Sequence, residues 1–368
     1  MTELIGPRDD SSGDGPGGSA FVDWEFAKAT GRRLASPGPK VSAAEAAEIV
    51  GRLREVALAA QEPIARTSRL HSPGDAPAAI VVDRPGWIAA NIDSMKHLMA
   101  PVIEKVSAGA HPGSSPVTAI GGKVTGAEAG ALMAFFASKV LGQYDLAPEG
   151  TPRLMLVAPN IVTVERELGV DPHDFRLWVA MHEETHRVQF TAVPWLRAHM
   201  VERTRTLSTE LAPTASELSD RLQEVARRLP QAFQPGSQGL GEVFLTPEQR
   251  ESVAQITAIM SLLEGHADVM MDDVGPQVIP TVADIRAKFS GRRNGVSGLD
   301  KMLRRVLGLE AKMRQYADGA GFVRGVIDRV GLDDFNAVWT SPQTLPTPEE
   351  VSRPQVWVER VHGRTLGS

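Results

Sequence analysis

The chain has 368 residues, a formal net charge of −6 and no cysteine. The lack of cysteine excludes disulfides, thiolate metal sites and a cysteine nucleophile, so any metal site must use His, Asp or Glu. The negative net charge gives no general case for binding nucleic acid, and we expect no nucleic-acid partner.

Residues 1–19 are polar and glycine-rich, and this composition predicts a disordered tail. The tail lacks the apolar core of a signal peptide, and no run of about 18 apolar residues exists that would span a membrane. We therefore expect a cytoplasmic protein without a membrane partner. Residues 20–368 are predicted to form a single unit, and two lobes with a boundary near residue 150 are the alternative.

Between the tail and residue 150 the pattern is mainly helical. Ser42 and Glu45 match a capping box, which predicts a helix from residue 42 to about residue 60. Residues 83–86 are typical of a turn into a helix, and Thr125 is the expected cap of a helix that runs to about residue 143. The small residues of this last helix suggest close helix packing. We also expect a short helix at 23–29 and a strand at 78–82.

Residues 153–158 form a short apolar run followed by a Pro-Asn pair, which predicts a strand that ends in a turn. Asp171 and Pro172 then predict the start of a helix, as an N-cap followed by proline at the first helical position. Several residues after this start recur at the spacing of one helical face, which indicates a buried face. They are Phe175, Trp178, Val179, His182 and His186.

This helix contains His-Glu-x-x-His at residues 182–186. Residues four apart share a helix face, so His182 and His186 can present two imidazole nitrogens to one metal ion, for which zinc is the expected metal. Glu183 follows the first histidine, where its carboxylate can take a proton from a zinc-bound water. A chance match is the alternative, but a buried Glu-His-His group without a metal leaves costly polar atoms to satisfy.

A third ligand is expected on a helix predicted from about Thr246 to about Asp273. Glu264 and Asp268 are four apart and share a face, whereas His266 points roughly the opposite way. We therefore favour Glu264 as the third ligand. Asp268, one turn on, is then placed to hydrogen-bond a ligand histidine. A solvated acidic face is the alternative, although neighbouring apolar residues indicate a largely buried helix.

The other segments predict further helices. Residues 194–232 indicate one or two amphipathic helices, and residues 234–241 a loop. Residues 283–330 predict two or three helices, broken at 291–298 and at Gly319. Residues 284–329 have an excess of basic residues, which we interpret as a solvated helical face. A patch for an acidic ligand or nucleic acid is the alternative, but aromatic residues at stacking spacing are absent. The proline-punctuated segment 341–357 is expected to wrap the surface.

Six segments together resemble a family of zincin-like hydrolases found mainly in actinobacteria. They are residues 22–24, 82–87, 182–186, 263–268, 308–316 and 336–339, within a resemblance that covers about 21–361. One branch of that family is labelled as associated with deazaflavin coenzyme biosynthesis. Glu264 and Asp268 also resemble the third-ligand helix of thermolysin-like zincins. The family implies a zincin-type helical site but does not supply a substrate.

In such metalloproteases an edge strand lies beside the active-site helix and pairs with the substrate backbone, and residues 153–158 are the candidate. An ordinary core strand is the alternative. We expect a mostly α fold of the α+β class. It would have a zincin-like metallopeptidase core with a small sheet, and extra N- and C-terminal helices around that core.

The predicted function is zinc-dependent hydrolysis of a peptide or other amide bond, with Glu183 as the general base. His266 or Tyr316 is the candidate donor to the tetrahedral oxyanion. One alternative is a non-catalytic zincin-fold scaffold that binds a protein partner. Another is an enzyme of coenzyme biosynthesis with a small-molecule substrate, although the sequence contains no phosphate loop or dinucleotide fingerprint. The oligomeric state is left open.

Overall fold

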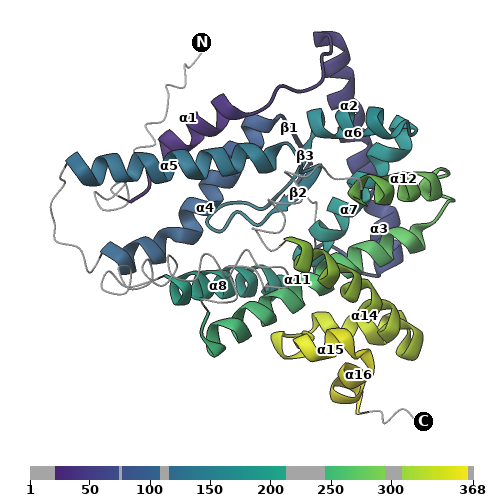
Figure 1. Cartoon of the computed structure of the whole chain (residues 1–368). Coiled ribbons are helices and arrows are strands. Elements are labelled where there is room, and N and C mark those ends of the chain that lie inside the picture. The colour runs from purple at the N-terminus through teal and green to yellow at the C-terminus, as the bar shows by residue number, and fades with distance from the viewer. Residues whose placement is uncertain (1–20, 74–76, 108–115, 213–244, 295–308, 364–368) are drawn as a thin grey trace, which may run out of the picture.

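The computed structural model describes residues 21–73, 77–107, 116–212, 245–294 and 309–363. Within these ranges the chain is mostly helical and has a small three-stranded sheet (Figure 1). The predicted disordered tail at 1–19, the helical segment after 212 and the loop at 234–241 lie outside the described residues. The elements are α1 (Trp24–Leu34), α2 (Ala43–Ala59), α3 (Gln61–Ser68), β1 (Ile80–Val82), α4 (Arg84–Ser107), α5 (Pro116–Ala137), β2 (Gly142–Asp145), β3 (Arg153–Val157), α6 (Ala158–Leu168), α7 (Pro172–Ala192), α8 (Pro194–Leu211), α11 (Pro247–Val274), α12 (Val282–Asn294), α14 (Leu309–Phe335), η2 (Asn336–Trp339), η3 (Pro342–Thr344), α15 (Pro348–Ser352) and α16 (Pro354–His362).

The sheet has the strand order β1-β3-β2, with β1 parallel and β2 antiparallel to β3. The strand predicted at 153–158 is therefore the central strand and not an edge strand, which corrects its assignment as the substrate-pairing strand. Its run of apolar residues suits a strand that is buried on both faces. The edge strand of this part of the chain is β2, where the sequence predicts the end of a helix.

The two faces of β3 belong to two different hydrophobic clusters. Leu154 and Leu156 point into the larger cluster, which includes α7, α11 and α14. Met155 and Val157 point into a smaller cluster with α1, α4 and α5. Alternate side chains of a strand lie on opposite faces, so five residues are enough to join both clusters. Figure 1 shows α1, α4 and α5 gathered on one side of the sheet.

Helix α5 differs from its prediction at both ends. Thr125 does not cap it but lies inside it, where its hydroxyl donates to the carbonyl of Gly121 at 3.1 Å. The predicted close packing is present. A Cβ atom built at Gly126 would lie 2.5 Å from the carbonyl oxygen of Asp23, the N-cap of α1, and one at Gly130 would lie 2.3 Å from that of Ala27 in α1. The helix ends at Ala137, and the chain then turns into β2.

Gly319 does not break a helix, contrary to the prediction. Helix α14 runs through it, and the non-helical backbone lies at Gly331, with φ 83°. A Cβ atom at Gly319 would lie 2.0 Å from the carbonyl oxygen of Ser261, and one at Gly265 would lie 2.1 Å from the carbonyl carbon of Gly319. The two glycines therefore allow α11 and α14 to cross with their backbones in contact.

The C-terminal segment contributes to the core and does not merely wrap the surface as predicted. Trp357 is fully buried, and its indole nitrogen donates to the carbonyl of Thr344 at 2.8 Å. Glu350, also buried, accepts two hydrogen bonds from Arg360 at 2.6 and 2.9 Å. The guanidinium holds the pKa of Glu350 below its usual value against the opposing effect of burial. This segment thus closes the larger cluster against α14.

Among the described residues, no helix combines the length and apolar content needed to cross a membrane.

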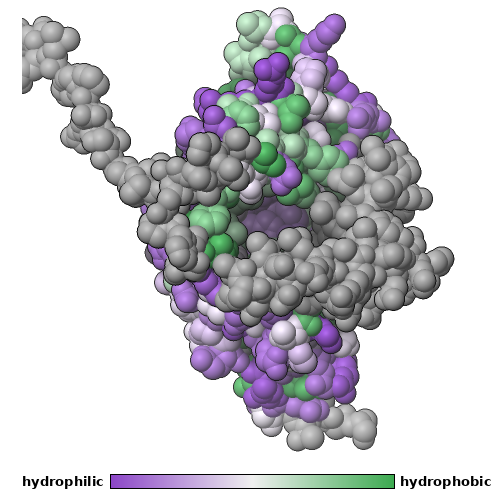
Figure 2. All heavy atoms as spheres, turned by 60° about the vertical axis from the view of Figure 1, so that its left-hand side comes forward, coloured by the Kyte–Doolittle hydropathy of each residue, from purple (hydrophilic) through white to green (hydrophobic). Residues whose placement is uncertain are grey.

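Figure 2 shows the molecule turned so that the side with α1, α4 and α5 faces the reader. This face is hollowed, and hydrophilic side chains form the floor of the hollow with hydrophobic ones beside it.

The crossing of α11 and α14 predicts a large effect of one methyl group. We expect Gly319→Ala to lower the free energy of unfolding by about 1–3 kcal/mol, because the helices must separate to admit the methyl group. Gly321→Ala is the matched control, since no atom lies within 4 Å of a Cβ atom there. It should leave stability unchanged or raise it by about 0.5–1 kcal/mol. Thermal unfolding of both variants measures this, and equal midpoints would contradict the close crossing.

Candidate active site

Helix α7 begins where the sequence predicts, at an N-cap. The carboxylate of Asp171 accepts from the backbone N–H of Asp174 at 2.9 Å, and Pro172 occupies the first helical position. The rest of the helix is packed on most sides, with Phe175, Val179 and Ala180 almost completely buried. This packing fixes the direction in which the histidine side chains leave the helix.

Helix α11 also begins as predicted. Thr246 and Gln249 form a reciprocal capping box, in which each side chain accepts from the other residue's backbone N–H at 3.2 and 3.0 Å. The helix packs against α7, α8 and α14. Glu264 lies near the middle of α11, where the contact with α7 places its carboxylate beside the two histidines.

The structure brings His182, His186 and Glu264 together, and one possible ligand atom of each lies within 4.8 Å of the others. The two Nε2 atoms are 3.2 Å apart. The Glu264 oxygens lie 3.6 Å from the Nε2 of His182 and 3.8 Å from that of His186. Bonds of about 2.0–2.1 Å in a tetrahedral zinc site separate the ligand atoms by about 3.3 Å, so the three residues fit that ion.

The tautomer of His186 also suits a metal ligand. The amide nitrogen of Gln189 donates to the carbonyl of Leu263 at 2.9 Å, so the amide oxygen faces the Nδ1 of His186 at 3.0 Å. An oxygen there can only accept, and the proton of His186 therefore lies on Nδ1. This leaves a lone pair on Nε2, directed toward His182 and Glu264.

Gln189 is a positioning residue that the sequence analysis does not identify. It is fully buried and lies three residues after His186 on the same helix face. Its signal in the sequence is a polar residue on a buried helix, one turn beyond a candidate ligand. Orientation of a ligand histidine through its second nitrogen is a general property of metal sites.

His266 lies behind Gln189 and not in the cleft. It is fully buried, and its Nδ1 lies 2.9 Å from the amide nitrogen of Gln189. Burial and, to a smaller extent, the neighbouring His186 together lower the pKa of His266 to about 3, so the ring is neutral. Its Nε2 has no hydrogen-bond partner among the described residues. This position suits support of Gln189 better than the predicted contact with a substrate oxyanion.

Glu183 is 6% exposed and lies against the first residue of β2. A Cβ atom at Gly142 would be 2.5 Å from the Cγ of Glu183 and 2.8 Å from its Oε1. Burial raises the pKa of Glu183 well above its usual value, and the charge of Glu264 raises it further. The glycine therefore allows the edge strand to approach a carboxylate that the helix directs toward it.

A cavity of about 280 Å³ opens over this group. Its walls include the three candidate ligands, Glu183 and apolar residues of α7, α8 and α11. They also include residues 142–144 of β2, which has no strand partner on its outer edge among the described residues. The candidate metal group, the candidate base and a free strand edge thus share one cleft.

Tyr144, which the sequence analysis does not single out, lines the cleft. Its ring stacks on Phe190 with 5.7 Å between the centroids, and burial raises the pKa of its hydroxyl. It is therefore a protonated donor at the cleft wall. The signal that would have found it is the strand at 142–145, where the sequence instead predicts a helix that ends at about residue 143.

Two other predicted residues are placed less fully. Asp268 lies one turn after Glu264 on α11 and is exposed, and its hydrogen bond to a ligand histidine stays a prediction. The Nδ1 of His182 on α7 lies 3.3 Å from the sulfur of Met271 on α11. Tyr316 falls within α14, but its side chain is outside the described part of the chain.

Residues 22–358 match a family described as zincin-like metallopeptidase. No curated protein matches the chain. Among solved structures, the chain is similar to a "putative hydrolase with a novel fold" from Chloroflexus aurantiacus, with 28% sequence identity and a TM-score of 0.66. This similarity covers 93% of the chain and 99% of the other protein.

The role of Gln189 can be tested by metal affinity. Gln189→Leu removes the acceptor for the Nδ1 proton of His186, and we expect zinc affinity to fall about 10–100-fold, as for other residues that orient ligands. His266→Leu is the matched control, since it leaves the Gln189 contacts to His186 and Leu263 in place. Competition with a fluorescent chelator measures both variants. Equal losses would indicate that only the packing between the helices matters.

Proposed function

The chain belongs to the zincin-like metallopeptidase family, and from this we propose that it is a zinc-dependent hydrolase of peptide or other amide bonds. The observation that supports this most is the convergence of two imidazole nitrogens and a carboxylate beside a separate, buried glutamate. A purely structural metal site needs ligands but no such base. The presence of Glu183 therefore favours an enzyme over a scaffold.

His182, His186 and Glu264 are the residues that would hold the ion. Zinc in such a site supplies Lewis acidity, which lowers the pKa of water and polarises a carbonyl group. The described residues add no fourth ligand to this group. A catalytic zinc site keeps such a position for water or substrate.

Glu183 is proposed to take the proton from the attacking water as its oxygen bonds to the substrate carbonyl carbon. The same carboxylic acid then gives this proton to the leaving amine as the carbon–nitrogen bond breaks. Tyr144 supplies a hydroxyl donor at the cleft wall for the negative charge on the carbonyl oxygen. The supporting features are the burial of Glu183 and its place in the same cleft.

The free edge of β2 supports an extended peptide as the substrate. Residues 142–144 line the cleft, and an unpaired strand edge can hydrogen-bond the backbone of an extended chain. Such pairing would hold the scissile bond beside Glu183, because Gly142 is in contact with that side chain.

The enzyme proposal predicts a separation of metal binding from turnover. Glu183→Gln keeps the shape of the side chain but removes the base, so we expect zinc content to stay at about one ion per chain. Turnover should fall about 10²–10⁴-fold. Digestion of an unbiased peptide and amide library, with elemental analysis of the same samples, measures both. If wild type and variant are equally inert while both hold zinc, the scaffold alternative replaces this proposal.

Gly142 predicts a second effect on the same base. Gly142→Ala forces either Glu183 or β2 to move, and a displacement of this kind costs about 10²-fold in rate. Zinc content should not change, because the three atoms nearest to a Cβ atom at Gly142 all belong to Glu183 and none to a candidate ligand. Gly150→Ala is the control, since a Cβ atom there meets only the Cβ of Ala147 at 3.5 Å. An unaffected rate in Gly142→Ala would show that the position of Glu183 does not limit turnover.

A further inference from the structure

The parallel strands β1 and β3 both lead directly into helices. Arg84 begins α4 two residues after β1 ends, and Ala158 begins α6 immediately after β3. Because the strands are parallel neighbours, both helix starts lie at the same edge of the sheet. Ligands of open α/β sheets bind outside the carboxyl ends of such strands.

A cavity of about 780 Å³ lies at this edge. Its walls are the linker 35–41, one face of α2, the strand β1 and the first turns of α4 and α6. Pockets of about 300–1,000 Å³ are typical of sites for small molecules. No residue that lines this cavity also lines the cleft at Glu183, so the two are separate.

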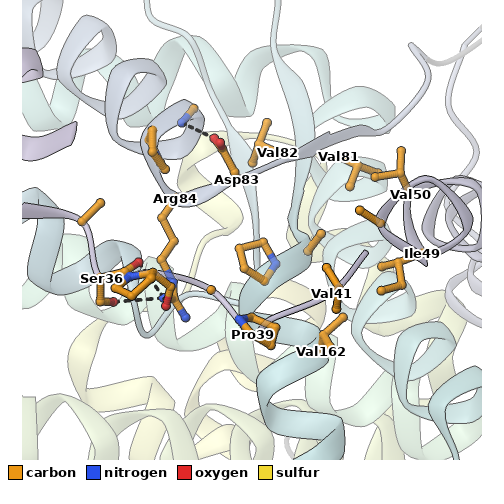
Figure 3. Close-up of a pocket in the computed structure, with 18 of the residues that line it drawn as sticks. Ser36, Pro39, Val41, Ile49, Val50, Val81, Val82, Asp83, Arg84 and Val162 are labelled. Carbon is orange, nitrogen blue, oxygen red and sulfur yellow. Dashed lines mark hydrogen bonds between the residues drawn. The ribbon is translucent and has the colours of Figure 1, made fainter. Parts of the chain in front are cut away.

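The two ends of the cavity differ in chemistry (Figure 3). One end is apolar, and the other contains Ser36 and the side chain of Arg84. The residues labelled at the apolar end are Val41, Ile49, Val50, Val81 and Val162. A ligand with a polar group at one end and a hydrocarbon body would match this division.

Arg84 is a buried cation without an acidic partner in the described chain, and only 6% of its surface is exposed. Its Nε donates to the amide oxygen of Asn160 at 2.7 Å, and its Nη1 to the carbonyls of Ser36 and Pro37 at 2.8 and 2.6 Å. These acceptors are neutral. The Nη2 has no hydrogen-bond partner among the described residues, and it keeps some accessible surface.

This guanidinium therefore loses hydration without gaining a counter-charge. Burial lowers the pKa of Arg84, and no nearby carboxylate opposes that shift. A buried, unpaired charge is unfavourable, and an anion that bonds to the remaining nitrogen would relieve it. The remaining nitrogen carries two N–H groups, which can donate charge-assisted hydrogen bonds to a carboxylate.

The other charged groups around the cavity do not replace that anion. Asp83 lines it, but its carboxylate accepts from the backbone N–H of Gly86 at 2.7 Å and points away from Arg84 (Figure 3). Arg32, which is exposed, adds a second cation at the wall. The first turn of α6 has no side-chain cap, so its positive end also favours an anion near Ala158.

We propose that this cavity binds a small amphiphilic carboxylate, with the carboxylate on Arg84 and the hydrocarbon body against Val81, Val41 and Ile49. A single buried cation matches a group with one negative charge. A free inorganic anion would leave the apolar walls of the cavity in contact with water, and a neutral hydrocarbon would leave Arg84 unpaired.

Calorimetric titration of the full chain with decanoate tests this proposal. We expect one saturable site per chain, with affinity about tenfold or more above that of decan-1-ol, because only the acid forms a charge-assisted bond to Arg84. Acetate and inorganic phosphate should show no saturable binding. Equal affinity for decanoate and decan-1-ol, or binding of phosphate alone, would overturn the assignment of an amphiphilic carboxylate.

Two variants locate the site. Ala46 lines the cavity from α2, whereas the adjacent Ala47 is exposed and does not line it. Ala46→Trp should abolish decanoate binding by filling the cavity, and Ala47→Trp should bind as wild type does. Equal binding by both would place the ligand elsewhere and reject the proposal.

The charge is tested by Arg84→Gln, which should lower decanoate affinity about tenfold and leave decan-1-ol affinity unchanged. Because Arg84 also anchors the linker at Ser36 and Pro37, thermal unfolding of this variant is measured alongside. If the variant does not fold, the ratio of decanoate to decan-1-ol affinity in wild type decides whether the charge is recognised. A folded variant with unchanged decanoate affinity would show that Arg84 only anchors the linker, and it would reject the pairing of the carboxylate with Arg84.

Discussion

The amide of Gln189 is buried where α7 meets α11, and it bonds to both helices at once. Its nitrogen donates to the carbonyl of Leu263 on α11, and its oxygen accepts from His186 on α7. A buried amide must satisfy both its donor and its acceptor, so the separation and the register of the two helices are coupled. That coupling places Glu264 opposite the two histidines. It also keeps the proton of His186 on Nδ1, so that Nε2, which faces Glu264, has a free lone pair. The candidate metal group therefore depends on a residue that would not itself bind the metal.

The small sheet separates two kinds of site. On its antiparallel side, the edge strand β2 lies against α7, and Gly142 lets the backbone reach Glu183. On its parallel side, β1 and β3 end together and lead into α4 and α6, so that two helix starts and Arg84 surround a cavity. The central strand β3 serves both sides because its alternate residues face different clusters. The strand order β1-β3-β2 therefore places an edge strand beside the candidate active site and the ends of two parallel strands beside the second cavity.

Glycine contacts determine how closely the helices approach. The pairs α1–α5 and α11–α14 cross with backbone atoms so near that a methyl group would not fit at Gly130 or Gly319. The sequence analysis treats Gly319 as a helix break, since glycine is a poor helix former in isolation. In the folded chain, the packing that glycine permits outweighs its low propensity, because the neighbouring helix fills the space of the missing side chain.

Features that depend on local spacing and capping could be predicted from the sequence. They include the start of α7 at Asp171, the start of α11 at Thr246, and the common face of His182 and His186. The sequence also indicated a mostly helical fold with a small sheet, and the resemblance to a zincin-like family implied a site on a helix. Glu264 was selected over His266 by helix geometry alone, and the structure places these two side chains on different sides of α11.

The packing of distant segments was needed to show which strand is an edge and which glycine lies at a helix crossing. It was also needed to place Gln189 and Tyr144 at the site. The short strand β2 has a weak pattern of its own, and its conformation depends on pairing with β3. The role of Gln189 depends on a carbonyl 74 residues away in the chain. Contacts between distant segments leave little mark on local periodicity, because they depend on the final packing of whole elements.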